Sequence, residues 1–133
     1  KDLRDVYHLL SLLESDAAGV VAATASDADL LELRGLHEAL TASRHETDRF
    51  FALNERFHLR LLEIADNRWR LQMVSDLRKV MKLNRHHSLF KSGRIDESLA
   101  EHDAIMSALL DRNAALTAQR MRAHFASGLE AAT

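Results

Sequence analysis

Several residues that shape protein folds are missing or scarce in this 133-residue sequence. It has no cysteine, which excludes disulfides and thiolate metal sites and slightly favours a cytoplasmic location. It has no proline and only four glycines, so most of the turn-forming residues that connect strands in sheets and hairpins are missing. It has no signal-peptide pattern and no apolar run of about 18 residues. We therefore expect neither a membrane span nor a membrane partner.

An excess of charge of one sign is also missing. The formal net charge is −2, which gives no electrostatic reason for these residues to bind nucleic acid. Apolar residues make up 47% of the chain, which excludes disorder, and the length suits one domain with a sizeable core. The chain starts at Lys1 without a methionine, already within a helical pattern, so we expect it to be a piece of a longer protein.

Apolar residues recur at helical spacing along almost the whole chain. Ser26 or Asp27 is a good N-cap for the second helix, and the Asp66-Asn67 pair ends the third. An all-α, antiparallel bundle of six to seven helices is therefore the expected fold. The helices expected from the pattern cover about 2–23, 26–40, 47–64, 68–89, 95–112 and 114–129.

Three of the eight histidines lie within the apolar stripes of three different expected helices: His58, His102 and His124. Burying an imidazole leaves two ring nitrogens to satisfy, and each unpaired group costs about 1–3 kcal/mol. A divalent metal takes one nitrogen of each ring, while the other nitrogen donates to a nearby acceptor. Asn54 lies four residues before His58 on the same helix face, so its side-chain carbonyl is a candidate fourth ligand.

Two other classes of protein fit parts of this pattern. Histidines in apolar stripes are more often ordinary core residues, so a metal-free helical interaction domain is one alternative. A hydrolase-like or di-iron-like helical enzyme is the other, because three histidines with an open position can activate water. A hydrolase needs a positioned base, but Glu55 and Glu101 are turned about 100° from the neighbouring ligands. A di-iron site needs two Glu-x-x-His motifs, and only Glu55 to His58 forms one. We therefore expect no catalysis.

Four short motifs follow one another along nearly the whole chain. They are Leu-Glu at 13–14 with Ala-Ala at 17–18, Leu-Asn-Glu-Arg-Phe-His at 53–58 with Ala-Asp-Asn at 65–67, Glu-Ser-Leu-Ala-Glu-His at 97–102, and Ala-Ala at 114–115 with Ala118, Met121 and His124. In this order they resemble the FCD-type effector-binding domain of FadR-subfamily GntR transcription regulators. Each motif is weak by itself, and the shared order makes the resemblance specific.

The resemblance implies a helical bundle that encloses a divalent metal and a small carboxylate metabolite. By position, the implied metal ligands are Asn54, His58, His102 and His124, with Zn²⁺ or Ni²⁺ favoured and Mn²⁺ or Co²⁺ as alternatives. Residues 1–133 would then be the effector-binding and dimerisation domain of a cytoplasmic homodimer. Operator DNA would be bound only by a winged helix-turn-helix domain upstream of Lys1, which this sequence does not contain.

Two positions depart from the family pattern. Asn54 stands where aspartate is common, so metal affinity should fall, while more of the metal's charge remains for an anionic effector. Leu10 stands where the family often has an arginine. We therefore expect other residues to bind the effector. The candidates are Arg85 and Arg78, which could instead be exposed to solvent. His37 is a further candidate, although packing in the core is the favoured interpretation for it.

Overall fold

The computed structural model describes residues 1–133, which form seven α-helices and no strand. This confirms the all-α bundle expected from the sequence. None of the helices combines the length and the apolar character needed to cross a bilayer. The helices are α1 Asp2–Thr24, α2 Asp27–Ala42, α3 Thr47–Ile64, α4 Arg68–Val80, α5 Lys82–Ser88, α6 Arg94–Leu110 and α7 Ala114–Ala132.

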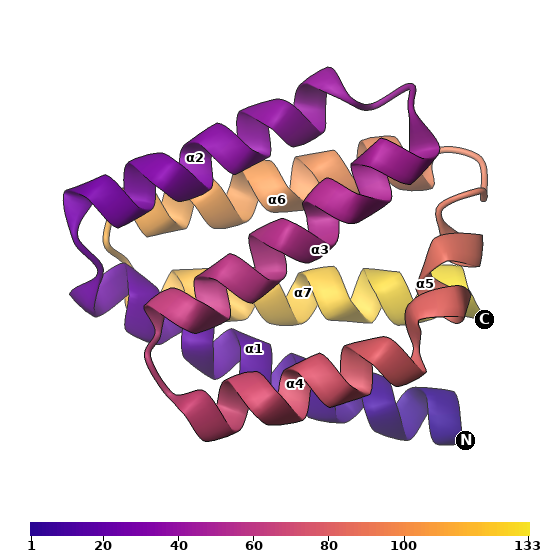
Figure 1. The fold of residues 1–133 in the computed structure, drawn as a ribbon, viewed down its shortest axis with the longest axis horizontal. Coiled ribbons are helices and arrows are strands. Elements are labelled where there is room, and N and C mark those ends of the chain that lie inside the picture. Colours follow the sequence, from indigo (N-terminus) through magenta and orange to yellow (C-terminus); the bar gives the residue numbers. More distant parts are fainter.

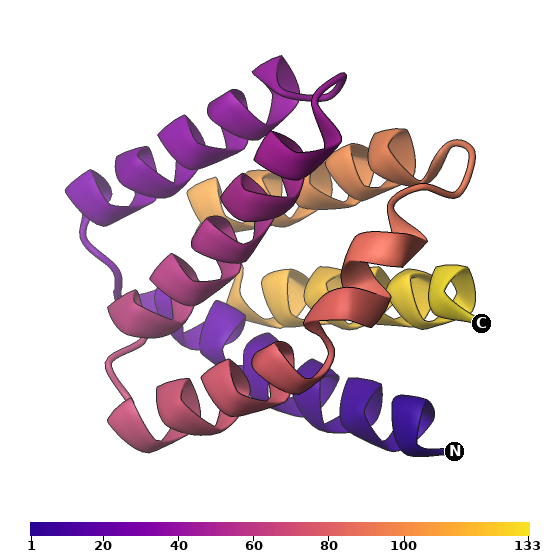
Figure 2. The same ribbon diagram turned by 45° about the vertical axis from the view of Figure 1, so that its right-hand side comes forward.

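The long helices reverse direction from one to the next, and both chain termini lie at the same end of the bundle (Figure 1). Helix α1 packs most extensively against α7, and α6 lies between α7 and α2. Helix α3 crosses this arrangement obliquely and contacts α1, α2 and α4, as both ribbon views show (Figures 1 and 2). The oblique crossing places the inner face of α3 opposite the inner faces of α6 and α7.

Short polar side chains set several helix boundaries. Ser26, Asn67 and Asn113 cap α2, α4 and α7, each accepting a hydrogen bond from the backbone N–H three residues later, at 3.0, 3.0 and 3.1 Å. These bonds satisfy amides that have no partner within the helix. Asp66 and Arg112, directly before two of the caps, adopt left-handed backbone angles with φ of 58° and so end α3 and α6.

The single helix expected over 68–89 is wrong, because the chain breaks at Met81 into α4 and α5. No proline or glycine marks this break in the sequence. Its cause is tertiary: α4 packs on α1 and α3, whereas α5 turns away to pack on α7. After the turn, Arg85 and Ser88 line a cavity together with residues of α7.

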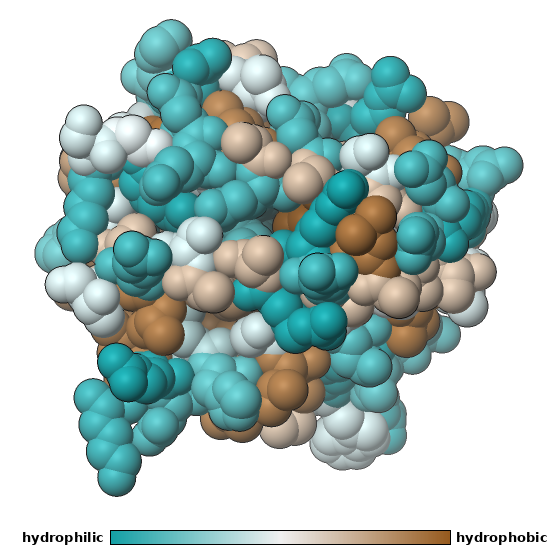
Figure 3. Space-filling model, turned by 180° about the vertical axis from the view of Figure 1, so that it is seen from behind, coloured by the Kyte–Doolittle hydropathy of each residue, from teal (hydrophilic) through white to brown (hydrophobic).

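The core is apolar with a few buried polar exceptions. Side chains such as Phe50, Phe57 and Leu61 are fully buried. From the face opposite to Figure 1, the surface is mostly hydrophilic, and its hydrophobic residues form several separate spots (Figure 3). The buried exceptions matter most, because each buried polar group needs a partner. They include Glu14, His58, Arg78, Arg94, His102 and His124.

Candidate metal centre

The three predicted histidines converge at one point inside the bundle. His58 comes from α3, His102 from α6 and His124 from α7, and all three are buried. Their ring centroids are separated by 5.2 Å (His58 to His102), 4.8 Å (His102 to His124) and 5.4 Å (His58 to His124). One ligand atom from each ring lies within 4.8 Å of the other two. Only the packing of α3, α6 and α7 brings together residues so distant in sequence.

Two of the histidines are held by carboxylates, of which that of Glu14 is fully buried and that of Glu101 is partly buried. Nδ1 of His58 lies 2.7 Å from Oε1 of Glu14 on α1, and Nδ1 of His124 lies 2.6 Å from Oε1 of Glu101 on α6. A carboxylate accepts hydrogen bonds, so Nδ1 is the donor in each neutral ring. In the neutral form of each ring, the lone pair is then on Nε2. This is the arrangement in which outer carboxylates orient metal-binding histidines.

Unsatisfied buried atoms at the same point test whether a metal fits. The side-chain oxygen of Asn54 is buried without a hydrogen-bond partner, and so are both ring nitrogens of His102. Asn54 lies one helical turn before His58 on α3, and both residues line the same cavity. Nitrogens bound to one Zn²⁺ lie about 3.3 Å apart, so the three rings, whose ligand atoms lie within 4.8 Å of one another, would move closer together to bind it. The donor set of three imidazoles and one amide oxygen therefore fits a divalent transition metal.

The electrostatics also favour neutral imidazoles at the centre. Burial, followed by the positive charge of Arg78, lowers the pKa of His58 well below 6.5. Burial, with the neighbouring histidines His124 and His58, likewise lowers the pKa of His102 well below 6.5. Both rings are therefore neutral at pH 7, and their lone pairs remain available to a metal.

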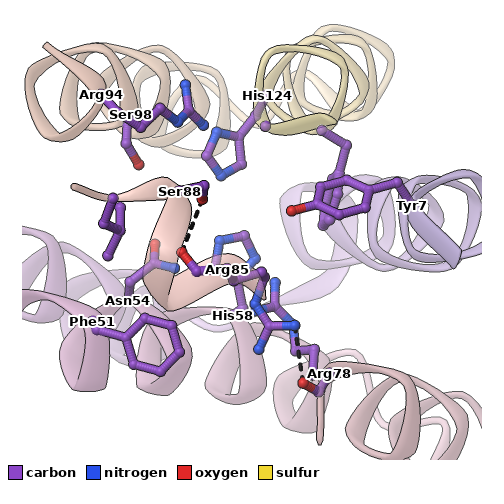
Figure 4. Close-up of a pocket in the computed structure, with 13 residues that line it drawn as sticks. Tyr7, Phe51, Asn54, His58, Arg78, Arg85, Ser88, Arg94, Ser98 and His124 are labelled. Carbon is purple, nitrogen blue, oxygen red and sulfur yellow. Dashed lines mark hydrogen bonds between the residues drawn. The ribbon is translucent and has the colours of Figure 1, made fainter. Parts of the chain in front are cut away.

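A small cavity adjoins the histidines, with a volume of about 50 Å³. Three arginines line it, together with Ser88 and Ser98. Arg94 and Ser98 lie beside His124 on one side, and Arg85 lies beside His58 on the other (Figure 4). Arginine side chains therefore line the cavity on both sides. The three arginines are Arg78, Arg85 and Arg94.

The two arginines predicted from the sequence form ion pairs, and Arg78 is buried while Arg85 is partly buried. Arg78 donates to Glu14 through Nε at 2.9 Å and to Glu55 through Nη1 at 2.7 Å. Arg85 pairs with Glu55 and donates to the backbone carbonyl of Arg78 at 3.0 Å. Burial tends to raise the pKa of Glu55, but Arg78 and Arg85 outweigh it and lower the pKa overall. Glu55 is therefore an ionised structural partner of the arginines.

His37 lies apart from the cavity. It is on α2, where its Nε2 contacts Oδ1 of Asp103, and it is not among the residues that line the space beside the histidines. Leu10, which stands where the family often has an arginine, is fully buried in the apolar core. The arginines at the cavity come instead from α4, α5 and α6.

Sequence reasoning missed the roles of three residues of the site. Glu14 and Glu101 belong to the Leu-Glu and Glu-His motifs, so their positions were visible although their partners were not. Arg94 follows Gly93 in the loop-like stretch 91–94 and resembles a solvated residue. In the structure Arg94 is buried, with both terminal nitrogens 3.3 Å from the carboxylate of Glu101. Glu101 in turn contacts His124 on α7, so Arg94 is joined to the histidines through this carboxylate.

A seven-helix bundle with inward-facing histidines and an arginine-lined cavity has the form of a small-molecule-binding domain. The family comparison agrees, since the FCD domain model matches residues 5–127. The chain belongs to the FCD domain family, which confirms the resemblance found in its motifs.

Comparison with individual proteins shows that the fold is shared with a solved structure. No curated protein matches the sequence. Among solved structures, the chain is similar to Lar, which controls the expression of the Listeria monocytogenes agr system and mediates virulence. The two share 15% sequence identity with a TM-score of 0.82, over 96% of this chain and 61% of the Lar chain. This chain therefore spans less than two thirds of that structure.

Proposed function

We propose that this chain is the ligand-sensing domain of a transcription regulator, which holds a divalent metal and binds a small organic acid beside it. One observation carries the proposal. Three buried histidines from three helices place their ligand atoms within 4.8 Å of one another, next to a buried oxygen of Asn54 that has no partner. Buried polar atoms without partners, as on Asn54 and His102, are costly, and a cation bound here would satisfy them.

The donor set limits the metal. Imidazole nitrogens suit Zn²⁺ and Ni²⁺ best, and Mn²⁺ or Co²⁺ are alternatives, because such sites follow availability as well as affinity. His58, His102 and His124 would bind as neutral ligands, and Asn54 would add a neutral oxygen. The protein ligands themselves leave the charge of the cation uncompensated, and this favours an anionic ligand.

The chain's own residues favour a carboxylate of few atoms. When bound, the metal supplies a Lewis-acidic centre to which a carboxylate oxygen can bind. Arg94 is the arginine best placed to bind a second anionic group of the effector. Its contacts with Glu101, at 3.3 Å, are longer than those that Arg78 makes with Glu14 and Glu55, so Arg94 is held less tightly by its partner. Ser98 lies beside Arg94 and adds a hydroxyl donor (Figure 4). The cavity volume of about 50 Å³ limits the effector to a small acid.

A physical connection leads from this site to the first helix. Glu14 on α1 contacts His58 through one carboxylate oxygen and Arg78 through the other. A shift of His58 on ligand binding would therefore act directly on α1. In the whole protein, a winged helix-turn-helix domain joined before α1 would bind operator DNA, and two chains would form a homodimer. The regulatory role and the partners are parts of the proposal.

The carboxylates near the centre support sensing over catalysis. A metal-dependent hydrolase needs a free carboxylate to accept a proton from water. Both oxygens of Glu55 are engaged by Arg78 and Arg85, and Glu101 is engaged by His124 and Arg94. We therefore assign no catalytic residue.

Metal titration of purified protein tests the proposal. We expect one metal ion per chain in elemental analysis and loss of tight binding in His102→Ala and in His124→Ala. The matched control is His45→Ala, which removes an exposed histidine in the turn between α2 and α3. This variant should bind metal like the parent protein. Unchanged stoichiometry and affinity in both buried-histidine variants, with circular dichroism showing intact helices, would refute the site.

The effector part needs a separate measurement. Calorimetry of the metal-loaded protein against a panel of small mono- and dicarboxylates should show binding that disappears when the metal is removed. Arg94→Gln should weaken the binding of acids that carry a second anionic group more than the binding of acids that carry only one. Equal binding by metal-loaded and metal-free protein would contradict the proposed role of the cation.

A further inference from the structure

The three histidines differ in what holds their outer nitrogens. His58 and His124 each have a carboxylate on Nδ1, whereas neither ring nitrogen of His102 has a hydrogen-bond partner. One nitrogen of a neutral imidazole carries a lone pair and the other carries a hydrogen. A metal would take the lone pair of His102 and leave its N–H buried without an acceptor. Metal-binding histidines almost always donate this hydrogen to an acceptor.

His37 supplies the missing acceptor type. Its ring lies 6.2 Å from the ring of His102 between centroids, with 21° between their planes. His37 is 7% exposed, and its Nδ1 is buried without a partner. Its Nε2 contacts the carboxylate of Asp103, so Nε2 carries the hydrogen and Nδ1 of the neutral ring carries a lone pair. The free lone pair and the free N–H are therefore complementary.

The other ring neighbours of His102 cannot take this role. Phe57, with its centroid 5.0 Å away, has no acceptor nitrogen. His58 and His124 donate through Nδ1 to Glu14 and Glu101, and their remaining lone pairs serve the metal. Among the aromatic rings packed around His102, His37 is the one whose lone pair is left over.

We propose that His37 is the positioning residue of the metal ligand His102, accepting its N–H directly after a small ring movement or through one bridging water. Asp103 holds His37 in the required tautomer from the next position on α6 after His102. This inference rests on the proposed metal site and deepens it. Each metal-binding histidine would then have an outer partner: Glu14 for His58, Glu101 for His124, and the His37–Asp103 pair for His102.

The inference predicts a specific effect on metal affinity. Loss of an outer partner of a ligating histidine lowers metal affinity by about 10- to 100-fold. His37→Phe removes the acceptor and keeps a ring, so it should show this loss with an unchanged stoichiometry of one metal per chain. His37→Gln keeps an acceptor oxygen and should retain most of the affinity. The control Glu38→Gln changes an exposed neighbour on α2 and should match the parent protein.

Chelator competition with Zn²⁺ measures these affinities, and NMR measures the tautomers. In the metal-loaded parent protein, long-range ¹H–¹⁵N spectra should show His37 protonated at Nε2 and unprotonated at Nδ1. Asp103→Asn provides a second variant that does not depend on core packing, because the Asp103 side chain is 73% exposed. It should lower Zn²⁺ affinity in the same direction as His37→Phe.

The outcomes separate the two proposals. Parent-like Zn²⁺ affinity in both His37→Phe and Asp103→Asn, or a proton on Nδ1 of His37, would overturn the role of His37 and leave the metal site intact. Failure of the parent protein to bind Zn²⁺, Ni²⁺, Co²⁺ or Mn²⁺ would instead refute the metal site, and this inference with it.

Discussion

Replacing Glu14 with glutamine removes one charge from the centre of the bundle while keeping the size of the side chain. Glu14 is fully buried on α1 and uses both carboxylate oxygens. Oε1 lies 2.7 Å from Nδ1 of His58, and Oε2 lies 2.9 Å from Nε and 2.8 Å from Nη2 of Arg78. The amide oxygen of glutamine can still accept from His58. The main loss in Glu14→Gln is therefore the charge that faces the buried guanidinium of Arg78.

The size of this loss follows from the burial of both partners. Breaking a buried ion pair by removing one member costs about 3–5 kcal/mol, because the remaining charge is left without compensation. Arg78 keeps its contact with Glu55, which places the expected loss near the lower end, at about 3 kcal/mol. Since a domain of this kind is stable by about 5–15 kcal/mol, the loss is a large part of the total.

Urea unfolding in the presence of a chelator measures this loss without a contribution from metal. With a slope of about 1–3 kcal/mol per molar urea, the midpoint should fall by about 1–3 M. The control Asp96→Asn removes a partner of Arg44 at the exposed surface, where water replaces the lost contact, so its midpoint should hardly move. A loss below about 1 kcal/mol in Glu14→Gln would show that Arg78 does not depend on this carboxylate.

Three further predictions concern the metal, pH and the core. At a free metal concentration of about 1,000 times Kd, removing the metal should lower the free energy of unfolding by about 4 kcal/mol. Equal urea midpoints with and without chelator would contradict this. Burial lowers the pKa of His58 and His102 in the folded domain, so the unfolded chain takes up protons first as the pH falls. The metal-free domain should therefore lose stability progressively below about pH 6.5, and a flat profile between pH 7.5 and 5 in urea unfolding would refute this. Leu10→Ala should cost about 2–5 kcal/mol because Leu10 is 0% exposed, whereas Leu9→Ala, at a position 45% exposed, should cost clearly less in the same assay.

The sequence by itself determined the fold class and the inward-facing histidines. Helical periodicity shows which residues of a helix face the interior, because apolar side chains recur every three or four positions. It therefore placed His58, His102 and His124 on buried faces, and the spacing of four residues placed Asn54 beside His58. Local chemistry also determined the cap at Ser26, since its hydrogen bond reaches only three residues along the chain.

Tertiary structure alone decided which side chains became partners. Periodicity cannot tell which helices will be neighbours, so the bonds of Glu14 to His58 and Arg78, formed across three helices, were not visible in the sequence. The same reason explains why the sequence did not reveal that Arg94 is buried, and why His37 was named as an effector-binding candidate while core packing was the favoured interpretation. The break at Met81 has no local signal either, because packing against α7 rather than helix propensity turns α5 inward. A helix carries its own periodicity, but its ion pairs depend on distances between helices that only the folded bundle fixes.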